Sequence, residues 1–286
     1  MLKLSAPSYT RVTLALDIVG KIASGPYAGY HELSIVKHRI QLFDTITIEE
    51  SDRTELICTH PLVPCDASNI CIQALNTLNT ICGTRNNVRI TLDKNIPVMG
   101  GLAGGSANAA TTLMLLNTMF KYKLSTADLM NVGRQLGMDV PYYFSGSTAF
   151  DTEATGILTQ IPTLLSFNFL IVIPDFGVST RNAYAAIDYN RINKNSNATA
   201  AMRTALAAND RALVVASMHN DFELSVFKSH PELASIKKEM LRAGCEQAMM
   251  SGSGSTLIGI LAKDADVEAV RAALPYTTRI VASHIV

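Results

Sequence analysis

The feature that most constrains the fold is a glycine-rich stretch between a predicted strand and a predicted helix. Residues 97–110 read PVMGGLAGGSANAA. The segment just before it, NVRITLD, alternates apolar and polar residues as a β-strand does. The segment that follows, 106–120, has high helix propensity and an apolar stripe at Leu113, Leu116 and Met119. The sequence therefore predicts the order strand, glycine-rich loop, helix.

Two interpretations of this loop are open from the glycines alone. It is either a tight turn that packs a helix against a sheet, or a loop that binds an anion. The second use is physically sound, because a helix N-terminus offers N–H groups and partial positive charge, and glycines let the backbone approach phosphate oxygens. The stretch lacks both the GxxxxGK[ST] pattern and the GxGxxG spacing.

A second glycine-rich element occupies residues 249–260, MMSGSGSTLIGI, just before a predicted strand. Alone it fits a hairpin turn. Two such loops, one in each half of the chain, indicate a shared cleft. Met249 and Met250 are expected to be core residues.

Composition excludes several classes of protein. The 286 residues carry 24 basic and 24 acidic side chains and are 48% hydrophobic, which is typical of a globular chain. With no basic block, we expect neither nucleic acid nor a membrane surface as a partner. No apolar run reaches the roughly 20 residues of a membrane-spanning helix, and the N-terminus lacks the apolar core of a signal peptide.

Cysteine and histidine usage gives no sign of a metal site. The five cysteines include no CxxC pair, so a cytoplasmic location fits best. The histidines show no metal-ligand spacing and are expected to be structural or surface residues; they include His38, His60, His219, His230 and His284.

The remaining patterns predict an α+β protein of two domains, 1–160 and 161–286. Residues 10–20 read as a half-buried strand. Ser125 and Asp128 begin a helix with a capping-box pattern, and Gly137 ends it. Further helices are predicted at 67–82, 200–218, 231–243 and 265–274, and strands at 44–50, 140–144, 147–150, 167–175, 255–262 and 278–286. Residues 190–201 form a polar connector without predicted structure. The second half resembles a split β-α-β sandwich, with helices on one face of an antiparallel sheet.

Three elements in order make the chain resemble the GHMP small-molecule kinase superfamily. They are SAPSYTRVTLAL, PVMGGLAGGSANAA and MSGSGST. The resemblance implies a GHMP kinase fold of two domains. The N-terminal domain would resemble domain 2 of ribosomal protein S5 and bind ATP, and the C-terminal domain would be a ferredoxin-like α/β sandwich on the substrate side. It also implies an ATP-dependent kinase that uses Mg²⁺ and acts as a monomer or homodimer. GYHEL, GMDVPYYFSGSTAF, GVSTRNAY and NDFE resemble the branch of the family that acts on a small molecule, cytidyl-diphosphate methylerythritol.

The resemblance also assigns nucleotide-binding residues. The central loop would wrap the triphosphate of ATP through Gly100, Gly101, Leu102, Gly104, Gly105 and Ser106. Ser106 would also face Mg²⁺. Asn69 and Lys94 match positions near the nucleotide, although single residues of these types are often only surface residues.

Two further positions would carry the reaction. Asp139 matches the family's catalytic aspartate, which positions the acceptor hydroxyl and takes its proton. The alternative is an aspartate that bonds its own turn. Arg11 stands where the family usually has a catalytic lysine, and Thr13 stands where it usually has asparagine. Arginine keeps the charge but has a different shape.

The substrate side is assigned in the same way. Tyr30 and His31 match a cytosine-binding pair, and Tyr184 matches an aromatic position on the other side of the base. Gly252 and Ser253 would close on the substrate diphosphate. Two alternatives stay open: a GHMP kinase for another alcohol of the homoserine, sugar or mevalonate type, or a weakly active nucleotide-binding homologue that has lost its lysine.

Overall fold

The computed structural model describes residues 2–192 and 197–283. Parts of the predicted connector 190–201 and of the predicted terminal strand 278–286, as well as His284, lie outside these residues. The chain divides into two compact units. Unit 1 contains Met1–Thr10, Leu42–Val98 and Ala103–Gly146, and unit 2 contains Arg11–Gln41, Met99–Leu102 and Ser147–Val286.

The two units interleave in the sequence because two long strands belong to both. These strands are β1 (Lys3–Lys21) and β2 (His31–Glu50), which are neighbours in one sheet. The sequence predicted only 44–50 for the second of them. The division into domains 1–160 and 161–286 stays a prediction.

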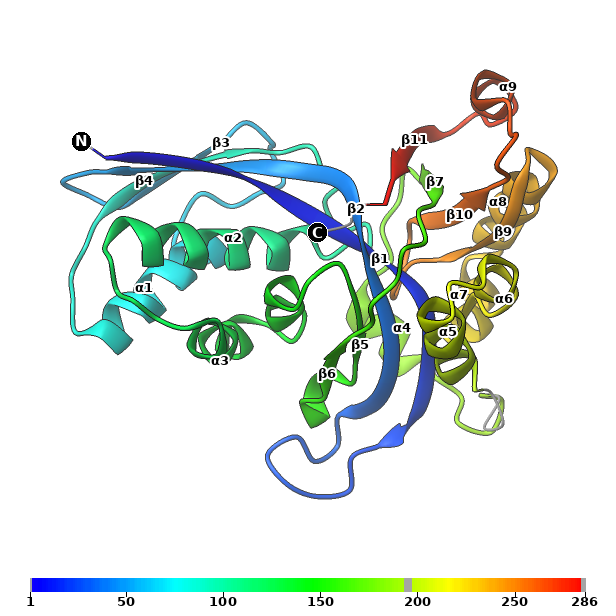
Figure 1. Cartoon of the computed structure of the whole chain (residues 1–286), viewed down its shortest axis with the longest axis horizontal. Coiled ribbons are helices and arrows are strands. Elements are labelled where there is room, and N and C mark those ends of the chain that lie inside the picture. The colour runs from blue at the N-terminus through cyan, green and yellow to red at the C-terminus, as the bar shows by residue number, and fades with distance from the viewer. Residues whose placement is uncertain (1, 193–196, 284–286) are drawn as a thin grey trace. The chain divides into compact units, whose positions relative to one another are not determined.

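Unit 1 is a sheet with helices on one side (Figure 1). The sheet order here is β3-β4-β2-β1, with β2 antiparallel to β4 and β3 parallel to β4. The elements within this unit are β3 (Glu55–Cys58), α1 (Ile70–Cys82), β4 (Val88–Asp93), α2 (Gly104–Met119), α3 (Thr126–Leu136) and the 3₁₀ helix η1 (Val140–Phe144). The predicted stripe of Leu113, Leu116 and Met119 is buried, and α2 packs against α1 and α3.

The third helix of unit 1 begins and ends where the sequence predicts. Ser125 accepts from the backbone of Asp128, whose carboxylate accepts in return from Ser125, and this makes a capping box. Gly137 caps the C-terminus by donating to Gly133. The predicted strand at 140–144 was wrong: with Pro141 in its first turn, the segment forms η1.

Unit 2 contains the remaining parts of β1 and β2 and a second sheet. On the first sheet, β8 pairs with β1, and β5 pairs with β2 and β6. The second sheet has the order β11-β7-β10-β9 and is antiparallel throughout, with α8 and α9 to one side of it (Figure 1). Numbered along the chain, these strands have the order 4-1-3-2, which confirms the predicted sandwich.

The strands of unit 2 are β5 (Thr148–Asp151), β6 (Leu158–Gln160), β7 (Asn168–Ile173), β8 (His219–Asn220), β9 (Cys245–Met250), β10 (Leu257–Leu261) and β11 (Thr277–Ala282). Its helices are η2 (Glu153–Thr155), α4 (Thr180–Ala185), α5 (Ala198–Ala207), α6 (Arg211–Ala216), α7 (Glu223–Ser229), α8 (Pro231–Arg242) and α9 (Val267–Ala272). The patterns did not predict α7, β3, β6, β8 or β9. Met249 and Met250 are buried, as expected.

The alternation of the first strand predicted that it would be half-buried, and this prediction was wrong. Every residue from Thr10 to Ile18 is buried, including the polar side chains of Arg11, Thr13 and Asp17. Polar groups are costly to bury without partners, so each needs a specific contact.

Asp17 has such contacts in a polar cluster with His219 and Asp221. These three offer ligand atoms within 4.8 Å of one another, although the histidines had shown no metal-ligand spacing. Hydrogen bonds of these residues account for the cluster. His219 contacts the Asp221 carboxylate at 2.8 Å, and Oδ2 of Asp17 accepts from the backbone N–H and the hydroxyl of Thr199. The cluster ties β1 to β8 and to the start of α5.

His38 is a structural histidine, as predicted. It is fully buried between the hydroxyls of Thr148 and Ser283, each 2.8 Å from a ring nitrogen. Burial lowers the pKa of His38 to about 4. Next to it, buried Lys37 pairs with Asp151 at 2.7 Å. No helix within 2–192 and 197–283 combines the length and hydropathy that a membrane span needs.

Candidate functional site

The glycine-rich loop has a backbone suited to anion binding. Three alternate residues adopt left-handed backbone angles: Met99 at φ 60°, Gly101 at φ 73° and Ala103 at φ 53°. Left-handed residues at alternate positions are one part of the backbone nests that bind anions, in which left- and right-handed residues alternate. A non-glycine residue at positive φ is uncommon, and this loop contains two.

The loop leads into a helix whose N-terminus has no side-chain cap. Asn69 caps α1 and Ser125 caps α3, but Ala103 precedes α2, and no described side chain caps this end. The first turn of α2 also carries no acidic residue. The N–H groups of the first turn therefore remain for a ligand with acceptor oxygens.

The glycines around this helix start differ in what surrounds them. A Cβ on Gly104 would lie 2.9 Å from Cγ2 of Ile96, so this glycine is needed for packing. A Cβ on Gly105 would have no described heavy atom within 4 Å, and Gly105 is exposed. Packing therefore explains Gly104, whereas Gly105 faces open space at the uncapped helix end.

Within unit 2, Gly101 lies directly against the second glycine-rich loop. A Cβ on Gly101 would come within 2.9 Å of the Gly254 carbonyl oxygen and closer still to that of Ser251. A Cβ on Gly252 would in turn lie 3.2 Å from the Gly101 oxygen. These loops approach backbone to backbone, which only glycine permits.

Arg11 and Thr13 attach to both loops from the buried face of β1. Nη1 of Arg11, which is 6% exposed, donates to the Gly101 carbonyl at 3.1 Å and to Thr13 Oγ1 at 3.3 Å. The Thr13 backbone N–H donates to Ser251 Oγ at 3.4 Å. The structure thus brings four predicted positions of unit 2 together: Arg11, Thr13, Gly101 and Gly252.

The NDFE segment holds the second loop in place, a role that the sequence did not reveal. The Asn220 amide donates to the carbonyls of Met250 at 2.7 Å and Gly252 at 2.8 Å. Glu223 accepts from the Met250 backbone at 2.7 Å. Ser253 contacts the Thr180 hydroxyl at 3.0 Å. The only signal had been the match of NDFE to the family.

Asp139 is at the N-terminal end of η1 in unit 1. Its side chain makes no capping hydrogen bond at the start of η1. A Cβ on Gly137 would be 3.9 Å from Ser106 Oγ, and Tyr143 donates to the Ala103 carbonyl at 3.1 Å. The segment 137–143 is therefore held next to the start of α2.

Lys94 and Asn69 have partners within unit 1. The Lys94 ammonium contacts Asp44 at 2.7 Å and the Ile96 carbonyl at 2.6 Å, and a Cβ on Gly104 would lie 3.3 Å from it. The Asn69 amide caps α1 at Cys71 and donates to Pro64. Lys94 is thus beside the helix start, whereas Asn69 has a structural role that the sequence did not indicate.

The predicted base-binding residues include an aromatic group in unit 2. The His31 and Tyr184 ring centroids are 4.6 Å apart, and Tyr184 packs edge-on against Phe222. Tyr30 is 54% exposed and contacts Tyr27 edge to face at 5.6 Å. Burial and the charge of Lys21 lower the pKa of His31, which favours a neutral ring at pH 7.

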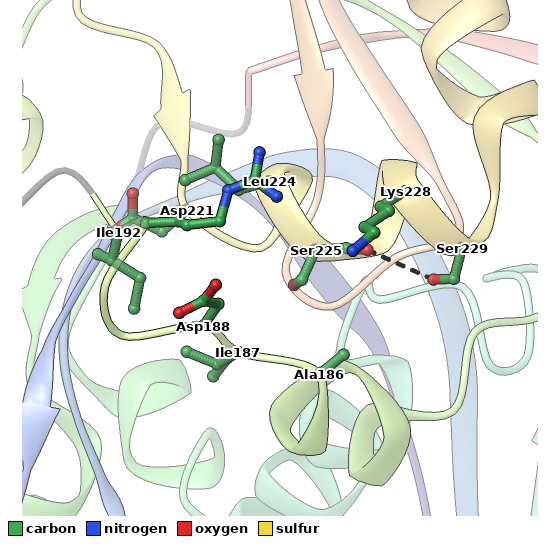
Figure 2. Close-up of a pocket in the computed structure, with 10 residues that line it drawn as sticks. Ala186, Ile187, Asp188, Ile192, Asp221, Leu224, Ser225, Lys228 and Ser229 are labelled. Carbon is green, nitrogen blue, oxygen red and sulfur yellow. Dashed lines mark hydrogen bonds between the residues drawn. The ribbon is translucent and has the colours of Figure 1, made fainter.

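A pocket of about 340 Å³ lies between the segment after α4 and helix α7 (Figure 2). Ile187, Asp188 and Ile192 line one side, and Leu224 and Lys228 line the other. No residue predicted as a site residue is among those that line it. The pocket instead marks where the segment 186–192 is held against α7.

Comparisons with known proteins identify the family. The description "GHMP kinases N terminal domain" matches residues 69–147, and "GHMP kinases C terminal" matches residues 202–278. The chain is 34% identical over 281 residues to 4-diphosphocytidyl-2-C-methyl-D-erythritol kinase of Chlorobium chlorochromatii, covering 96% of this chain and 94% of that protein. It is 34% identical over 252 residues to the protein of the same name from Clostridium perfringens (strain SM101), covering 87% and 86%.

Solved structures agree. A crystal structure of 4-(cytidine 5'-diphospho)-2C-methyl-D-erythritol kinase superposes with a TM-score of 0.78 and 26% identity, covering 98% of this chain and 99% of that one. Homoserine kinase from Cytophaga hutchinsonii superposes with a TM-score of 0.74 and 18% identity, covering 99% and 95%, which shows the shared fold.

Proposed function

The chain belongs to the GHMP kinases, and we propose on that premise that it phosphorylates the 2-hydroxyl of 4-diphosphocytidyl-2-C-methyl-D-erythritol. The phosphoryl donor would be ATP, and the reaction is a step of the non-mevalonate isoprenoid pathway. The names of its full-length relatives support this acceptor. A cytoplasmic location accords with such a metabolic role.

One observation carries the nucleotide part of the proposal: the uncapped N-terminus of α2 behind a loop of alternating left-handed residues. Backbone N–H groups at a helix start favour phosphate oxygens without a side-chain cation. Gly105 leaves this end open, and the Lys94 ammonium, which is paired with the Asp44 carboxylate, lies beside Gly104. These residues fit the triphosphate of ATP.

The helix start also offers an oxygen ligand for a magnesium ion. Mg²⁺ prefers oxygen ligands, and the Ser106 hydroxyl in the first turn of α2 is one such donor. When bound with ATP, Mg²⁺ neutralises charge on the β- and γ-phosphate oxygens.

Asp139 would position the acceptor hydroxyl and take its proton as the new phosphate ester forms. Phosphoryl transfer depends mostly on such positioning and on charge stabilisation. Arg11 would supply a fixed positive charge, since its guanidinium is held by Gly101 and Thr13. Arginine stays protonated at any working pH, so Arg11 acts by charge and not as a base.

On the acceptor side, His31 and Tyr184 would bind the cytosine ring and Tyr30 would cover it. Gly252 and Ser253 would contact the diphosphate of the acceptor through the second glycine-rich loop. This loop is held by Asn220 and Glu223, so its backbone is fixed before a ligand arrives.

The test incubates the protein with ATP, Mg²⁺ and each acceptor of a panel. Turnover is measured as ADP release, and the phosphorylated product is identified by mass spectrometry. The panel contains 4-diphosphocytidyl-2-C-methyl-D-erythritol, homoserine, mevalonate and galactose. We expect efficient turnover only with the first. Turnover with another alcohol and none with the cytidine compound would contradict the proposal and favour the first alternative.

A further inference from the structure

Tyr189 contacts His31 through a hydrogen bond that the sequence did not predict. Tyr189 Oη is 2.5 Å from His31 Nδ1. The two rings are parallel within 3°, with centroids 6.0 Å apart. Nearly parallel rings that are joined by a 2.5 Å contact and have centroids 6.0 Å apart cannot overlap face to face, so the rings are offset. The hydroxyl thus contacts the imidazole at its Nδ1 edge.

The position of Tyr189 is set by a turn of its own segment. Asp188 accepts from Asn190 through its carboxylate at 3.0 Å, and from Arg191 and Ile192 through its carbonyl at 2.9 and 3.1 Å. Asp188 and Ile192 belong to the wall of the pocket in Figure 2, whereas Tyr189 is not among the lining residues. The turn therefore presents Tyr189 to His31 through hydrogen bonds of its own backbone and of Asp188.

The distances favour one placement of the shared proton. The Tyr189 hydroxyl has one proton to donate, and the two atoms within its reach are His31 Nδ1 at 2.5 Å and the Gly20 carbonyl oxygen at 3.5 Å. The longer contact is at the limit of a hydrogen bond. Donation to Nδ1 makes the shorter of the two contacts, and a neutral His31 that accepts at Nδ1 carries its own proton on Nε2.

We propose that Tyr189 is a positioning residue that makes His31 a hydrogen-bond donor at Nε2 and so favours a cytosine ring over a uracil ring. This inference rests on the proposed function. With Nδ1 occupied, Nε2 is the ring nitrogen left for a ligand. N3 of cytosine is an acceptor, whereas N3 of uracil carries a hydrogen that would face the Nε2 hydrogen. O2 accepts in both rings, so the preference requires that Nε2 contact N3, where uracil would set two donors against each other without an acceptor.

The experiment compares the parent with Tyr189→Phe, which removes the hydroxyl and keeps the ring. Nitrogen-15 NMR of the ligand-free proteins reports the tautomer of His31, assigned with His31→Gln. We expect the Nε2–H form in the parent and a mixture of tautomers in the variant. Kinetics with the cytidine acceptor and its uridine analogue should show a roughly tenfold fall in the ratio of kcat/KM, through KM for the acceptor, with KM for ATP unchanged.

Tyr276→Phe is the matched control, because it removes a tyrosine hydroxyl that interacts with Glu239 in the same unit. An Nδ1–H tautomer in the parent would overturn the inference even if the variant did not fold. So would a Tyr189→Phe enzyme that keeps both the tautomer and the cytidine preference. If the parent turns over no cytidine acceptor, the proposed function fails, and the NMR result still decides whether Tyr189 sets the tautomer.

Discussion

Replacing Gly105 with alanine separates the two uses of glycine in the central loop. Gly105 is in the first turn of α2, and an added Cβ would meet no described heavy atom within 4 Å. Alanine is the better helix former by about 0.5–1 kcal/mol, so the variant should unfold at a slightly higher temperature, by about 1–3 °C.

The same methyl group should weaken ATP binding. If phosphate oxygens lie against the first turn of α2, the methyl displaces at least one hydrogen bond to a charged group, which contributes about 1.5–3 kcal/mol. KM for ATP should then rise by about 10- to 100-fold. The two effects have opposite signs, so loss of folding cannot account for the weaker binding.

Calorimetry and initial rates at saturating acceptor measure both effects. Gly104→Ala is the contrasting variant, since its Cβ would lie 2.9 Å from Ile96 and should lower the unfolding temperature. Gly83→Ala, at φ 65° in the C-cap of α1, controls for lost stability and should leave KM for ATP unchanged. An unchanged KM for ATP in Gly105→Ala would refute the placement of phosphates at this helix end.

Three further predictions follow from charged groups. Asp139→Asn should lower kcat by about 10²- to 10⁴-fold with the Kd for ATP unchanged, while Asp52→Asn, at an exposed loop, serves as its control; an active Asp139→Asn enzyme would refute the assigned base. Arg11→Lys should lower kcat/KM by about tenfold, or 1.4 kcal/mol, because the shorter lysine would not place its ammonium where Nη1 of Arg11 donates to Gly101 and Thr13; a large gain in turnover would instead show that arginine impairs the enzyme. Burial lowers the pKa of His38 from an ordinary 6.5 to about 4. The free energy of unfolding should therefore fall by up to about 3 kcal/mol as pH drops from 6.5 to 4, and urea unfolding of His38→Asn should show a smaller fall over the same pH range.

One more prediction concerns His219, whose effect on stability changes with pH in the direction opposite to that of His38. The hydrogen bond to Asp221 raises the pKa of His219, so its stabilising contribution is complete below about pH 6.5 and is lost as pH rises through the raised value. Urea unfolding of His219→Gln against the parent should show a difference that shrinks at alkaline pH. A constant difference across pH would contradict this assignment.

Local patterns predicted the elements whose residues determine their own structure. The capping box at Ser125 and Asp128 and the buried stripe of α2 depend on contacts within a few residues, so spacing was enough. The prediction of a strand at 140–144 was wrong because valine, tyrosine and phenylalanine favour strands, whereas Pro141 and the packing of Val140 on Gly133 give a 3₁₀ helix.

The site was predicted from the order of its motifs and not from single residues. Arg11 and Thr13 read as the polar face of a half-exposed strand, because the segments that bury them come from elsewhere in the sequence. The role of Asn220 depends on a loop 30 residues farther along the chain. The contact of Tyr189 with His31 spans 158 residues, and no local pattern reports such a distance.

The interleaving of the two units has a consequence for synthesis on the ribosome. Ala15 and Leu16 of β1 leave the ribosome early, yet their parallel partners His219 and Asn220 in β8 are made about 200 residues later. Unit 2 therefore cannot complete its fold until most of the chain has been translated. Until then, the edge of β1 that pairs with β8 has no partner strand. A nascent chain stalled near residue 160 would hold all of unit 1 but only the opening strands of unit 2. Unit 1 should thus be protected from proteolysis first, while the stretch from Arg11 to Gln41, which belongs to unit 2, stays sensitive until translation is nearly complete.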